Sequence, residues 1–197
     1  MTTASTQKPG RPRSERSHRA VLDAARELLT DGGLPALTVD QIAIRAGVSK
    51  NTIYRWWPNK GAVLMDAFTE ATSQKLRAPS SGSALERFRT QVHRVAALMN
   101  EPNARRPFVA LVAASQHDPE LAAALRDRFI ADRRASAAAL LTEVASEHPL
   151  TADLDPDIVI DLVYGGLYYR LLITGQSTHP AEVNRLLDAV LRSGPAT

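Results

Sequence analysis

Cysteine is absent from this chain of 197 residues. Its absence excludes a disulfide framework and any metal site built from thiolates, and it fits a reducing compartment. Long apolar runs are absent too, because no run approaches the length that spans a membrane and the N-terminal segment lacks the apolar stretch of a signal peptide. We therefore expect a cytoplasmic protein that has no membrane partner.

Patterns typical of enzymes and metalloproteins are missing as well. The sequence contains no Gly-rich phosphate loop and no spacing of metal ligands. Ser115, His117 and Asp118 are near neighbours, but adjacency along a chain does not build a catalytic triad. We predict no catalytic residues, no metal and no cofactor. A helical enzyme or a non-DNA interaction module is the alternative.

The sequence does contain enough apolar material for a folded domain. Hydrophobic residues make up 44% and charged residues 23%, which are ordinary globular values. The net charge of +3 is unevenly distributed: residues 1–60 hold 10 Lys and Arg against 5 Asp and Glu, and residues 61–197 hold 14 against 16. A basic N-terminal third suggests a polyanionic partner, although a solvated basic tail would have the same composition.

Apolar residues recur at helical spacing along most of the chain, and no segment alternates as a β-strand does. We predict an all-α fold of about nine helices, with a loop at 148–156. The predicted helices are 16–30, 38–46, 49–57, 59–77, 85–99, 103–115, 119–146, 157–174 and 181–192.

Local signals mark where several of these helices begin and end. Thr38 followed by Gln41 has the pattern of a capping box, and Ser49 is a natural N-cap. Pro58 must end the helix that Ser49 begins. Asp118-Pro119 supplies an N-cap followed by proline at the first helical position. The N-terminal third is thus divided into several short helices.

The segment DQIAIRAGVSKNTIYRWWPNK, residues 40–60, has the spacing of a helix-turn-helix. The motif needs a small residue where its two helices nearly touch, which Ala43 provides, and Gly47 permits the positive φ of the turn. An αα-corner without DNA-binding function is the alternative. Counted from Val39, the apolar positions 4, 8, 10, 15 and 18 are Ile42, Ala46, Val48, Ile53 and Trp56.

The second helix of this motif is predicted to project a polar and basic surface. Lys50 and Asn51 lie in its first turn and are the candidates for contacts with base edges, while Thr52 and Tyr54 suit phosphate oxygens equally well. Arg55 adds a further cation.

The aromatic pair after this helix and the next basic residue are also informative. Trp57 follows Ile53 by four residues and should pack inward, whereas Trp56 could pack inward or lie along the DNA backbone. Lys60 opposes the dipole of the next helix, a placement that makes sense beside a phosphate, although an exposed lysine would cost little there.

The leader KPGRPRSER, residues 8–16, is basic and rich in proline, and we predict that residues 1–13 form a disordered basic arm. Arg11 and Arg13 could enter a narrow minor groove. Non-specific attraction to phosphates is the alternative for this arm.

Residues 37–64, LTVDQIAIRAGVSKNTIYRWWPNKGAVL, closely resemble the N-terminal domain of the tetracycline-repressor (TetR) family of bacterial transcriptional regulators. The resemblance covers about residues 14–68. The sequence departs from the family pattern at Trp56, where the family commonly has histidine or another polar or aromatic residue, and at Trp57, where phenylalanine is usual.

This resemblance implies a homodimeric, ligand-responsive repressor of a palindromic double-stranded DNA operator. It implies a DNA-binding domain at 14–60 and a helical body at 61–197 that binds a small organic effector. It also implies phosphate contacts from Thr38, Tyr54 and Lys60, and base contacts from Lys50, Asn51 and Thr52. A regulator without a small-molecule effector is the alternative. The full predicted DNA-binding set is Arg11, Arg13, Thr38, Ser49, Lys50, Asn51, Thr52, Tyr54, Arg55, Trp56 and Lys60.

The two C-terminal helices are candidates for the dimer interface. Residues 157–175 are apolar nearly all round, and Gly165-Gly166 within them suggests a close approach of two helices. The resemblance places such a pair in an intersubunit four-helix bundle, while an intrachain core is the alternative. The predicted interface residues are Val163, Gly165, Gly166, Tyr169, Leu186, Leu187 and Val190.

The effector pocket gives the weakest signal in the sequence. Its predicted lining comes from the central helices, and each residue could instead belong to the core or the surface. The predicted lining residues are His93, Met99, Phe108, Leu111, Val112, Gln116, Phe129 and Tyr168, with His117 beside them.

Overall fold

A computed structural model describes residues 11–31, 37–77, 79–147, 155–176 and 178–191. These residues are helical without any strand, which confirms the all-α prediction. The elements are α1 (Arg11–Asp31), α2 (Val39–Ala46), α3 (Lys50–Tyr54), α4 (Lys60–Ser73), α5 (Ala84–Asn100), α6 (Pro102–Ser115), α7 (Pro119–Leu125), the π-helical turn η2 (Arg126–Ile130), α8 (Ala131–Glu147), α9 (Pro156–Tyr169), the π-helical turn η4 (Arg170–Thr174) and α10 (Pro180–Leu191).

The predicted helix starts agree with the caps in the structure. The Thr38 side chain accepts a hydrogen bond from the backbone N–H of Gln41 at 3.2 Å, and the Gln41 side chain accepts one from the Thr38 N–H at 3.0 Å. This reciprocal pair confirms the capping box. Ser49 caps α3, and Asp118 caps α7 with Pro119 in its first turn, so both of these predictions are also confirmed.

The structure differs from the sequence prediction at the first helix. α1 begins at Arg11, so the predicted disordered arm is wrong for residues 11–13. The physical reason is that Pro12 falls in the first turn, where a missing N–H breaks no intrahelical hydrogen bond. Residues 1–10, and residues 148–154 of the predicted loop, lie outside the described residues.

The predicted long helices are interrupted by π-turns. α7, η2 and α8 run on without a break, as do α9 and η4, so the described residues form nine helical rods, as the sequence predicts. In each π-turn one extra residue enters the turn and rotates the side chains that follow. α4 ends at Ser73 and is therefore shorter than the predicted helix, which extends to about residue 77.

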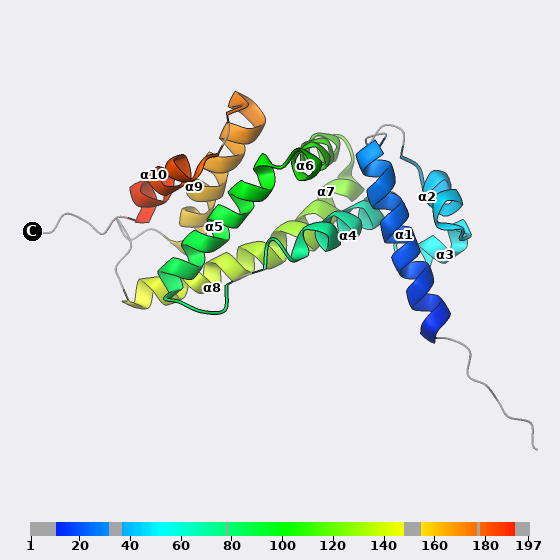
Figure 1. Cartoon of the computed structure of the whole chain (residues 1–197), viewed down its shortest axis with the longest axis horizontal. Coiled ribbons are helices and arrows are strands. Elements are labelled where there is room, and N and C mark those ends of the chain that lie inside the picture. Colours follow the sequence, from blue (N-terminus) through cyan, green and yellow to red (C-terminus); the bar gives the residue numbers. More distant parts are fainter. Residues whose placement is uncertain (1–10, 32–36, 78, 148–154, 177, 192–197) are drawn as a thin grey trace, which may run out of the picture.

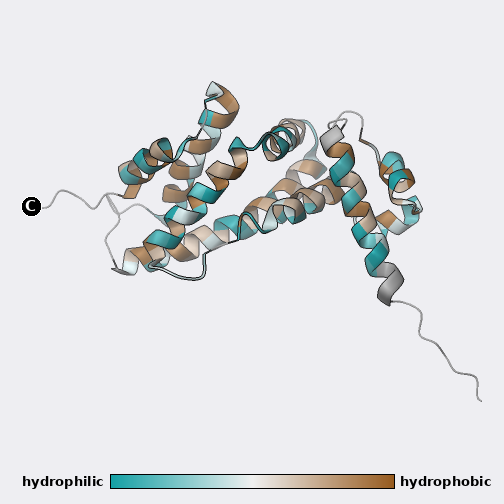
Figure 2. Cartoon of the chain, viewed as in Figure 1, coloured by the Kyte–Doolittle hydropathy of each residue, from teal (hydrophilic) through white to brown (hydrophobic). Residues whose placement is uncertain are grey.

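The rods form an elongated molecule (Figure 1). α1, α2 and α3 lie at one end, α5, α9 and α10 lie toward the other, and α4, α6 and α7 occupy the middle. Figure 2 shows that hydrophobic residues line much of α9, whereas hydrophilic and hydrophobic residues alternate along α10.

Two hydrophobic cores hold these elements together. The first runs from the N-terminal helices through α4 into α6, α7 and η2, and it includes Ile53, Trp57, Leu64 and Phe129. Because this core crosses residue 60, the N-terminal helices and the body are packed as one unit there. The second core lies among α5, α8, α9 and α10, and Tyr164 packs against both. Its buried residues include Phe88, Val92, Leu141, Val159, Val163 and Leu187.

Candidate nucleic-acid interface and ligand cavity

The turn between α2 and α3 depends on a left-handed glycine. Gly47 has φ 65° and ψ 35°, a conformation that a residue with a Cβ rarely adopts. Its N–H and that of Val48 donate hydrogen bonds to backbone carbonyls of α2, the latter to Ala43 O at 3.0 Å. Ala43 and Ile53 are buried, one from each helix. The two helices therefore form the helix-turn-helix that the sequence predicts.

α3 is short but fixed at both ends. The Ser49 hydroxyl accepts a hydrogen bond from the Thr52 N–H at 3.2 Å and lies 2.9 Å from the Thr52 hydroxyl. At the other end Trp57 is fully buried, which confirms its predicted inward packing. Its indole N–H donates to Asp66 Oδ2 at 2.8 Å, and its ring stacks on His18 at 4.6 Å between centroids. The helix is thus held while its outer face is left accessible.

The accessible face of α3 carries most of the predicted DNA-binding residues. Lys50, Asn51, Tyr54 and Arg55 are exposed, and Thr52 is half-buried. Trp56 is 41% exposed, with the Arg55 guanidinium 5.7 Å from its ring centroid. Trp56 therefore lies at the surface next to a cation.

Lys50 is paired within the chain. Its ammonium nitrogen lies 2.8 Å from Asp40 Oδ1 on α2, and this hydrogen bond and charge raise the pKa of Lys50. Both side chains are more than half exposed. A DNA phosphate or base edge would have to compete with Asp40 for this cation.

The remaining predicted DNA-binding residues lie at helix N-termini. Thr38 caps α2 and is exposed, and Lys60 is the first residue of α4, which Asn59 caps. Backbone N–H groups at such positions attract anions. Arg11 and Arg13 lie in the first turn of α1.

A cavity of about 380 Å³ lies between the two cores. Its walls come from α5, η2, α8 and α9, with one residue after α4. Most of the lining is apolar, and the polar groups converge from three helices. The lining residues are Leu76, Gln91, Val95, Ile130, Arg133, Arg134, Ile160, Asp161, Tyr164, Gly165 and Tyr168.

Arg133 is the half-buried cation of this cavity. Its Nη1 donates to the backbone carbonyl of Phe129 at 2.6 Å, and its guanidinium carbon lies 3.7 Å from the centroid of the Phe129 ring. Its Nε is buried without a hydrogen-bond partner. Burial lowers the pKa of Arg133, but a guanidinium remains charged in proteins.

Two tyrosines and a glutamine supply the other inward polar groups. Burial raises the pKa of Tyr168 to about 12 and raises that of Tyr164 further, so both hydroxyls stay protonated at neutral pH. The Gln91 amide donates to the Tyr164 hydroxyl at 3.5 Å. The cavity therefore offers hydroxyl donors beside a cation.

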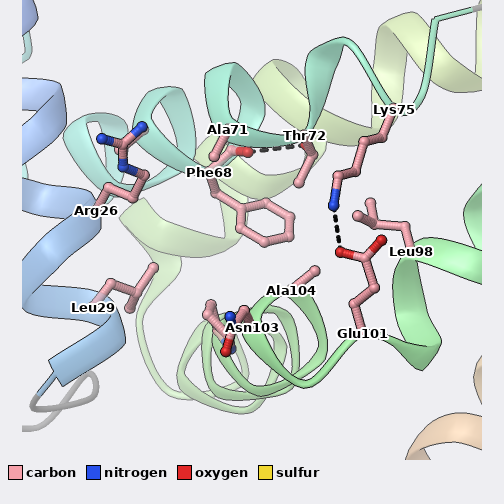
Figure 3. Close-up of a pocket in the computed structure, with 12 residues that line it drawn as sticks. Arg26, Leu29, Phe68, Ala71, Thr72, Lys75, Leu98, Glu101, Asn103 and Ala104 are labelled. Carbon is pink, nitrogen blue, oxygen red and sulfur yellow. Dashed lines mark hydrogen bonds and ion pairs between the residues drawn. The ribbon is translucent and has the colours of Figure 1, made fainter.

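A second, smaller hollow of about 240 Å³ lies where α1 meets α4 and α6 (Figure 3). Arg26 and Leu29 come from α1, Phe68 comes from α4, and Lys75 lies in the turn just after α4. Its inward cation, Lys75, already forms an ion pair with Glu101. The larger cavity is therefore the better candidate for an organic ligand.

Of the residues predicted to form an effector pocket, only Tyr168 lines the larger cavity. Phe108 and Phe129 pack against Phe68 and against each other with ring centroids 5.2–6.1 Å apart, and Tyr168 stacks on Phe108 at 5.4 Å. Met99 and Leu111 also belong to the first core. The aromatic side chains fill this space themselves, so the prediction is wrong for these four buried residues as lining of that cavity.

The polar members of the predicted pocket point elsewhere too. His93 is hydrogen-bonded to Asn184 Oδ1 on α10 at 2.8 Å. Gln116 is exposed, and its side-chain amide donates a hydrogen bond to the backbone carbonyl of Val112. Val112 is half-buried and His117 is exposed. The sequence prediction missed Arg133 and Tyr164; the only signal was the Tyr164/Tyr168 spacing on one face of α9.

The predicted dimer face is largely internal. Val163, Leu187 and Val190 are buried in the second core within one chain, as the intrachain alternative expects. Gly166 faces Leu186 so closely that a Cβ on it would lie 3.0 Å from a Leu186 methyl group. The close approach that the glycine pair predicts therefore occurs within one chain.

A different face of α9 is apolar and exposed. Tyr169 is 58% and Ile173 is 72% exposed, and Ile158 and Leu162 are about half exposed. Their spacing of four, seven and four residues places them on one side of the helix, with Gly165 between them. Of the predicted interface residues, Tyr169 and Gly165 lie on this face.

Membrane-spanning helices and metal-binding clusters can be assessed for the described residues. No helix there combines the length and apolar character that crossing a bilayer requires. No three His, Asp or Glu side chains there are grouped closely enough to hold a metal ion.

Comparison with known proteins agrees with this geometry. A family model described as bacterial regulatory proteins, tetR family, matches residues 21–67, and one described as tetracyclin repressor-like, C-terminal domain, matches residues 78–190. The chain is 40% identical over 190 residues to the HTH-type transcriptional regulator YdeS of Bacillus subtilis (strain 168), covering 96% of each protein.

Two further relatives extend the comparison. The crystal structure of the TetR family transcription regulator SCO0332 is 33% identical, with a TM-score of 0.73 over 88% of this chain and 95% of that one. The DNA-binding transcriptional repressor TetR of Mycobacteroides abscessus is 28% identical, covering 91% of this chain and 94% of that protein. The match to a family model over both halves, and to a relative along nearly its whole length, shows that this chain belongs to the TetR family of bacterial helix-turn-helix transcriptional regulators.

Proposed function

We propose that this regulator is a homodimeric repressor that binds a palindromic DNA operator and leaves it when a small organic molecule occupies the cavity among α5, α8 and α9. In this role the regulator would have no catalytic activity and would act in the cytoplasm, where bacterial DNA is found. The observation that carries the proposal is the capped, inwardly anchored α3, whose outer face presents Lys50, Asn51 and Tyr54.

The DNA-reading role rests on the shape and chemistry of α3. A helix held by a tight turn fits the major groove, where Lys and Asn side chains can contact base edges. Thr38 and Lys60, at the N-termini of α2 and α4, are suited to the flanking phosphates. We assign base contacts to Lys50, Asn51 and Thr52, and backbone contacts to Thr38, Tyr54 and Lys60. Ser49, Arg55, Trp56, Arg11 and Arg13 stay in the proposed DNA-binding set.

Dimerisation is supported by the exposed apolar face of α9. A single chain leaves Ile158, Leu162, Tyr169 and Ile173 open to water, which is unfavourable for such large apolar side chains. A second copy of the chain, applied through a two-fold axis, would cover this face with the same face of its own α9. The two α3 helices would then read half-sites about one helical turn of DNA, roughly 34–36 Å, apart.

The cavity can influence α3 through a short chain of contacts. Arg128 in η2 donates to both carboxylate oxygens of Asp66 on α4, at 2.9 and 2.8 Å. Asp66 in turn accepts the indole N–H of Trp57, which anchors the end of α3. Phe129 and Ile130, the next residues of η2, lie against Arg133 and the cavity. A ligand that shifts η2 would therefore act on the anchor of α3.

Energetics limit what the effector must do. It has to bind the arrangement that releases DNA more tightly than the arrangement that holds it, and a difference of about 1–3 kcal/mol gives the usual range of allosteric coupling. A ligand with equal affinity for both arrangements would not release the operator.

The test begins with duplexes selected from a random pool by the purified protein. Fluorescence anisotropy at several salt concentrations then measures specific and non-specific affinity. Lys60→Ala should weaken binding to all duplexes and reduce the salt slope by about one unit. Asn51→Ala should instead cost about 1–3 kcal/mol at particular base pairs of the selected site. If neither the wild-type protein nor a variant prefers any duplex, the proposed function is wrong.

A further inference from the structure

We propose that the effector of this regulator is an organic anion, an amphipathic carboxylate whose acid group pairs with Arg133 and whose apolar part occupies the rest of the cavity. This inference rests on the proposed function of the cavity, and it adds the chemical class of the ligand.

Arg133 lacks partners for much of its guanidinium group. Its guanidinium makes one hydrogen bond, to the Phe129 carbonyl, while Nε is buried without a partner. Among the described residues no carboxylate forms an ion pair with it. A half-buried guanidinium that lacks a paired carboxylate is less stable than a paired one, and a bound anion would supply that partner.

The nearby carboxylates form no ion pair with Arg133, although the charge of Asp132 on the same helix favours its charged form. Asp161 also lines the cavity, but its Oδ1 lies 2.6 Å from Nη1 of Arg134, which also pairs with Asp157 at 2.9 Å. Two carboxylates share this one guanidinium, so the exposed group keeps a net charge of −1, but neither carboxylate forms an ion pair with Arg133. Arg133 is therefore the cation that remains for an entering ligand.

The second argument is the position of the other polar groups. The Tyr164 and Tyr168 hydroxyls line the same cavity and, because burial keeps them protonated, can donate to a carboxylate oxygen. Guanidinium groups bind carboxylates through two parallel hydrogen bonds, which are stronger than bonds to a neutral acceptor. An acid group thus meets one cation and up to two hydroxyl donors.

The third argument is the apolar remainder of the wall. Leu76, Val95, Ile130 and Ile160 come from four separate segments and offer no charge. This surface suits an alkyl or aryl group, and a volume of about 380 Å³ lies within the range of pockets that hold small organic molecules. A cationic ligand would be repelled by Arg133, and a neutral one would leave it unpaired.

The test compares ligands that differ only in their head group. Octanoate and 4-phenylbutanoate are titrated against the full-length protein by calorimetry at neutral pH, alongside 1-octanol, 4-phenylbutan-1-ol and the corresponding amines. We expect at least one acid to bind about tenfold or more tightly than its matched alcohol, and the amines not to bind. Equal affinity for acid and alcohol, or preference for the amine, would overturn the proposal.

Variants then assign the preference to one side chain. Arg133→Met should retain operator binding while losing the preference for the acid, and Arg133→Lys should keep a weaker preference. Arg126→Met is the matched control, because Arg126 is exposed on η2 and does not line the cavity. Because the comparison of acid with alcohol uses the wild-type protein, it remains decisive even if a variant misfolds.

Operator release separates this inference from the proposed function. If an alcohol or an amine releases the selected duplex and the acids do not, the effector mechanism stands and the anionic ligand is wrong. If acids bind with the Arg133-dependent preference but no duplex is ever bound, the ligand class stands and the proposed function is wrong.

Discussion

At the scale of single residues, the structure shows that a cation predicted to read DNA already has a partner. Lys50 lies 2.8 Å from Asp40, and both belong to the same helix-turn-helix. An exposed pair of this kind contributes little to folding. Its effect on DNA binding can be larger, because Asp40 also repels phosphates from the surface that must approach them. In the proposed complex with DNA, Asp40 would therefore disfavour duplexes that offer only backbone charge.

We predict that Asp40→Asn increases affinity for non-specific DNA a few-fold and narrows the gap between specific and random duplexes. The reason is that Lys50 is freed while a negative charge is removed beside it. Anisotropy titrations at fixed salt measure both affinities. Asp23→Asn, on an exposed α1 residue paired with Arg26, changes net charge equally and is the control. An equal effect of both variants would mean that only net charge matters.

At the scale of elements, a single backbone angle sets the direction of α3. Gly47 holds φ at 65°, and no neighbouring atom lies within 4 Å of where its Cβ would be. Steric crowding by neighbours therefore does not explain the glycine, and the backbone conformation does. The reason for a glycine at position 166 is different, because there a Cβ would collide with Leu186 of the neighbouring helix α10.

We predict that Gly47→Val reduces operator affinity by tenfold or more, since a β-branched residue at positive φ must distort the turn, which costs about 1–3 kcal/mol. Gly47→Asn is the matched control, because asparagine tolerates the left-handed region and should retain most of the affinity. Anisotropy with the selected duplex measures both. Full affinity in the valine variant would contradict the turn described for the structure.

The contact between η2 and α4 gives a second prediction at this scale. Asp66→Asn should keep the hydrogen bond to the Trp57 indole while weakening the pair with Arg128, so operator binding should change little and effector-induced release should become smaller. The coupling is measured as the ratio of operator affinities with and without effector. A variant with unchanged coupling would show that the signal travels by another route.

At the scale of the whole molecule, the exposed side of α9 predicts the assembly. Val163, Leu187 and Val190 are buried inside the chain, so in the proposed dimer the partner would be bound through the outer residues Ile158, Leu162, Tyr169 and Ile173. In the proposed dimer the same helix would serve an internal core on one side and the interface on the other.

We predict that the protein sediments as a dimer of its 21.4 kDa chain at micromolar concentration and that Leu162→Glu yields monomers. A carboxylate in an apolar interface loses its hydration without gaining a partner. Analytical ultracentrifugation measures the mass, with circular dichroism to confirm folding. Ile44→Glu is the control, since Ile44 is an exposed apolar residue on α2 outside the proposed interface. A wild-type protein that remains monomeric would refute the assembly.

Most of the helices, the caps of α2, α3 and α7 and the turn before α3 could be predicted from the local sequence. Thr38 with Gln41, Ser49, Gly47 and the Asp118-Pro119 pair act within a few residues of chain, so their effects can be read locally. Contacts between segments distant in sequence fix which side of α9 faces water, where the cavity lies and that no carboxylate of the described residues forms an ion pair with Arg133. These features depend on which faces of α9 are covered by α5, α8 and α10, and on how η2 rotates the side chains that follow it. Contacts between residues distant in sequence leave no periodic pattern in the sequence, so they could not be predicted from it. Phe108 and Phe129, which were predicted to line an effector pocket, pack against each other instead of lining the cavity of about 380 Å³, and this contact also depends on the tertiary structure.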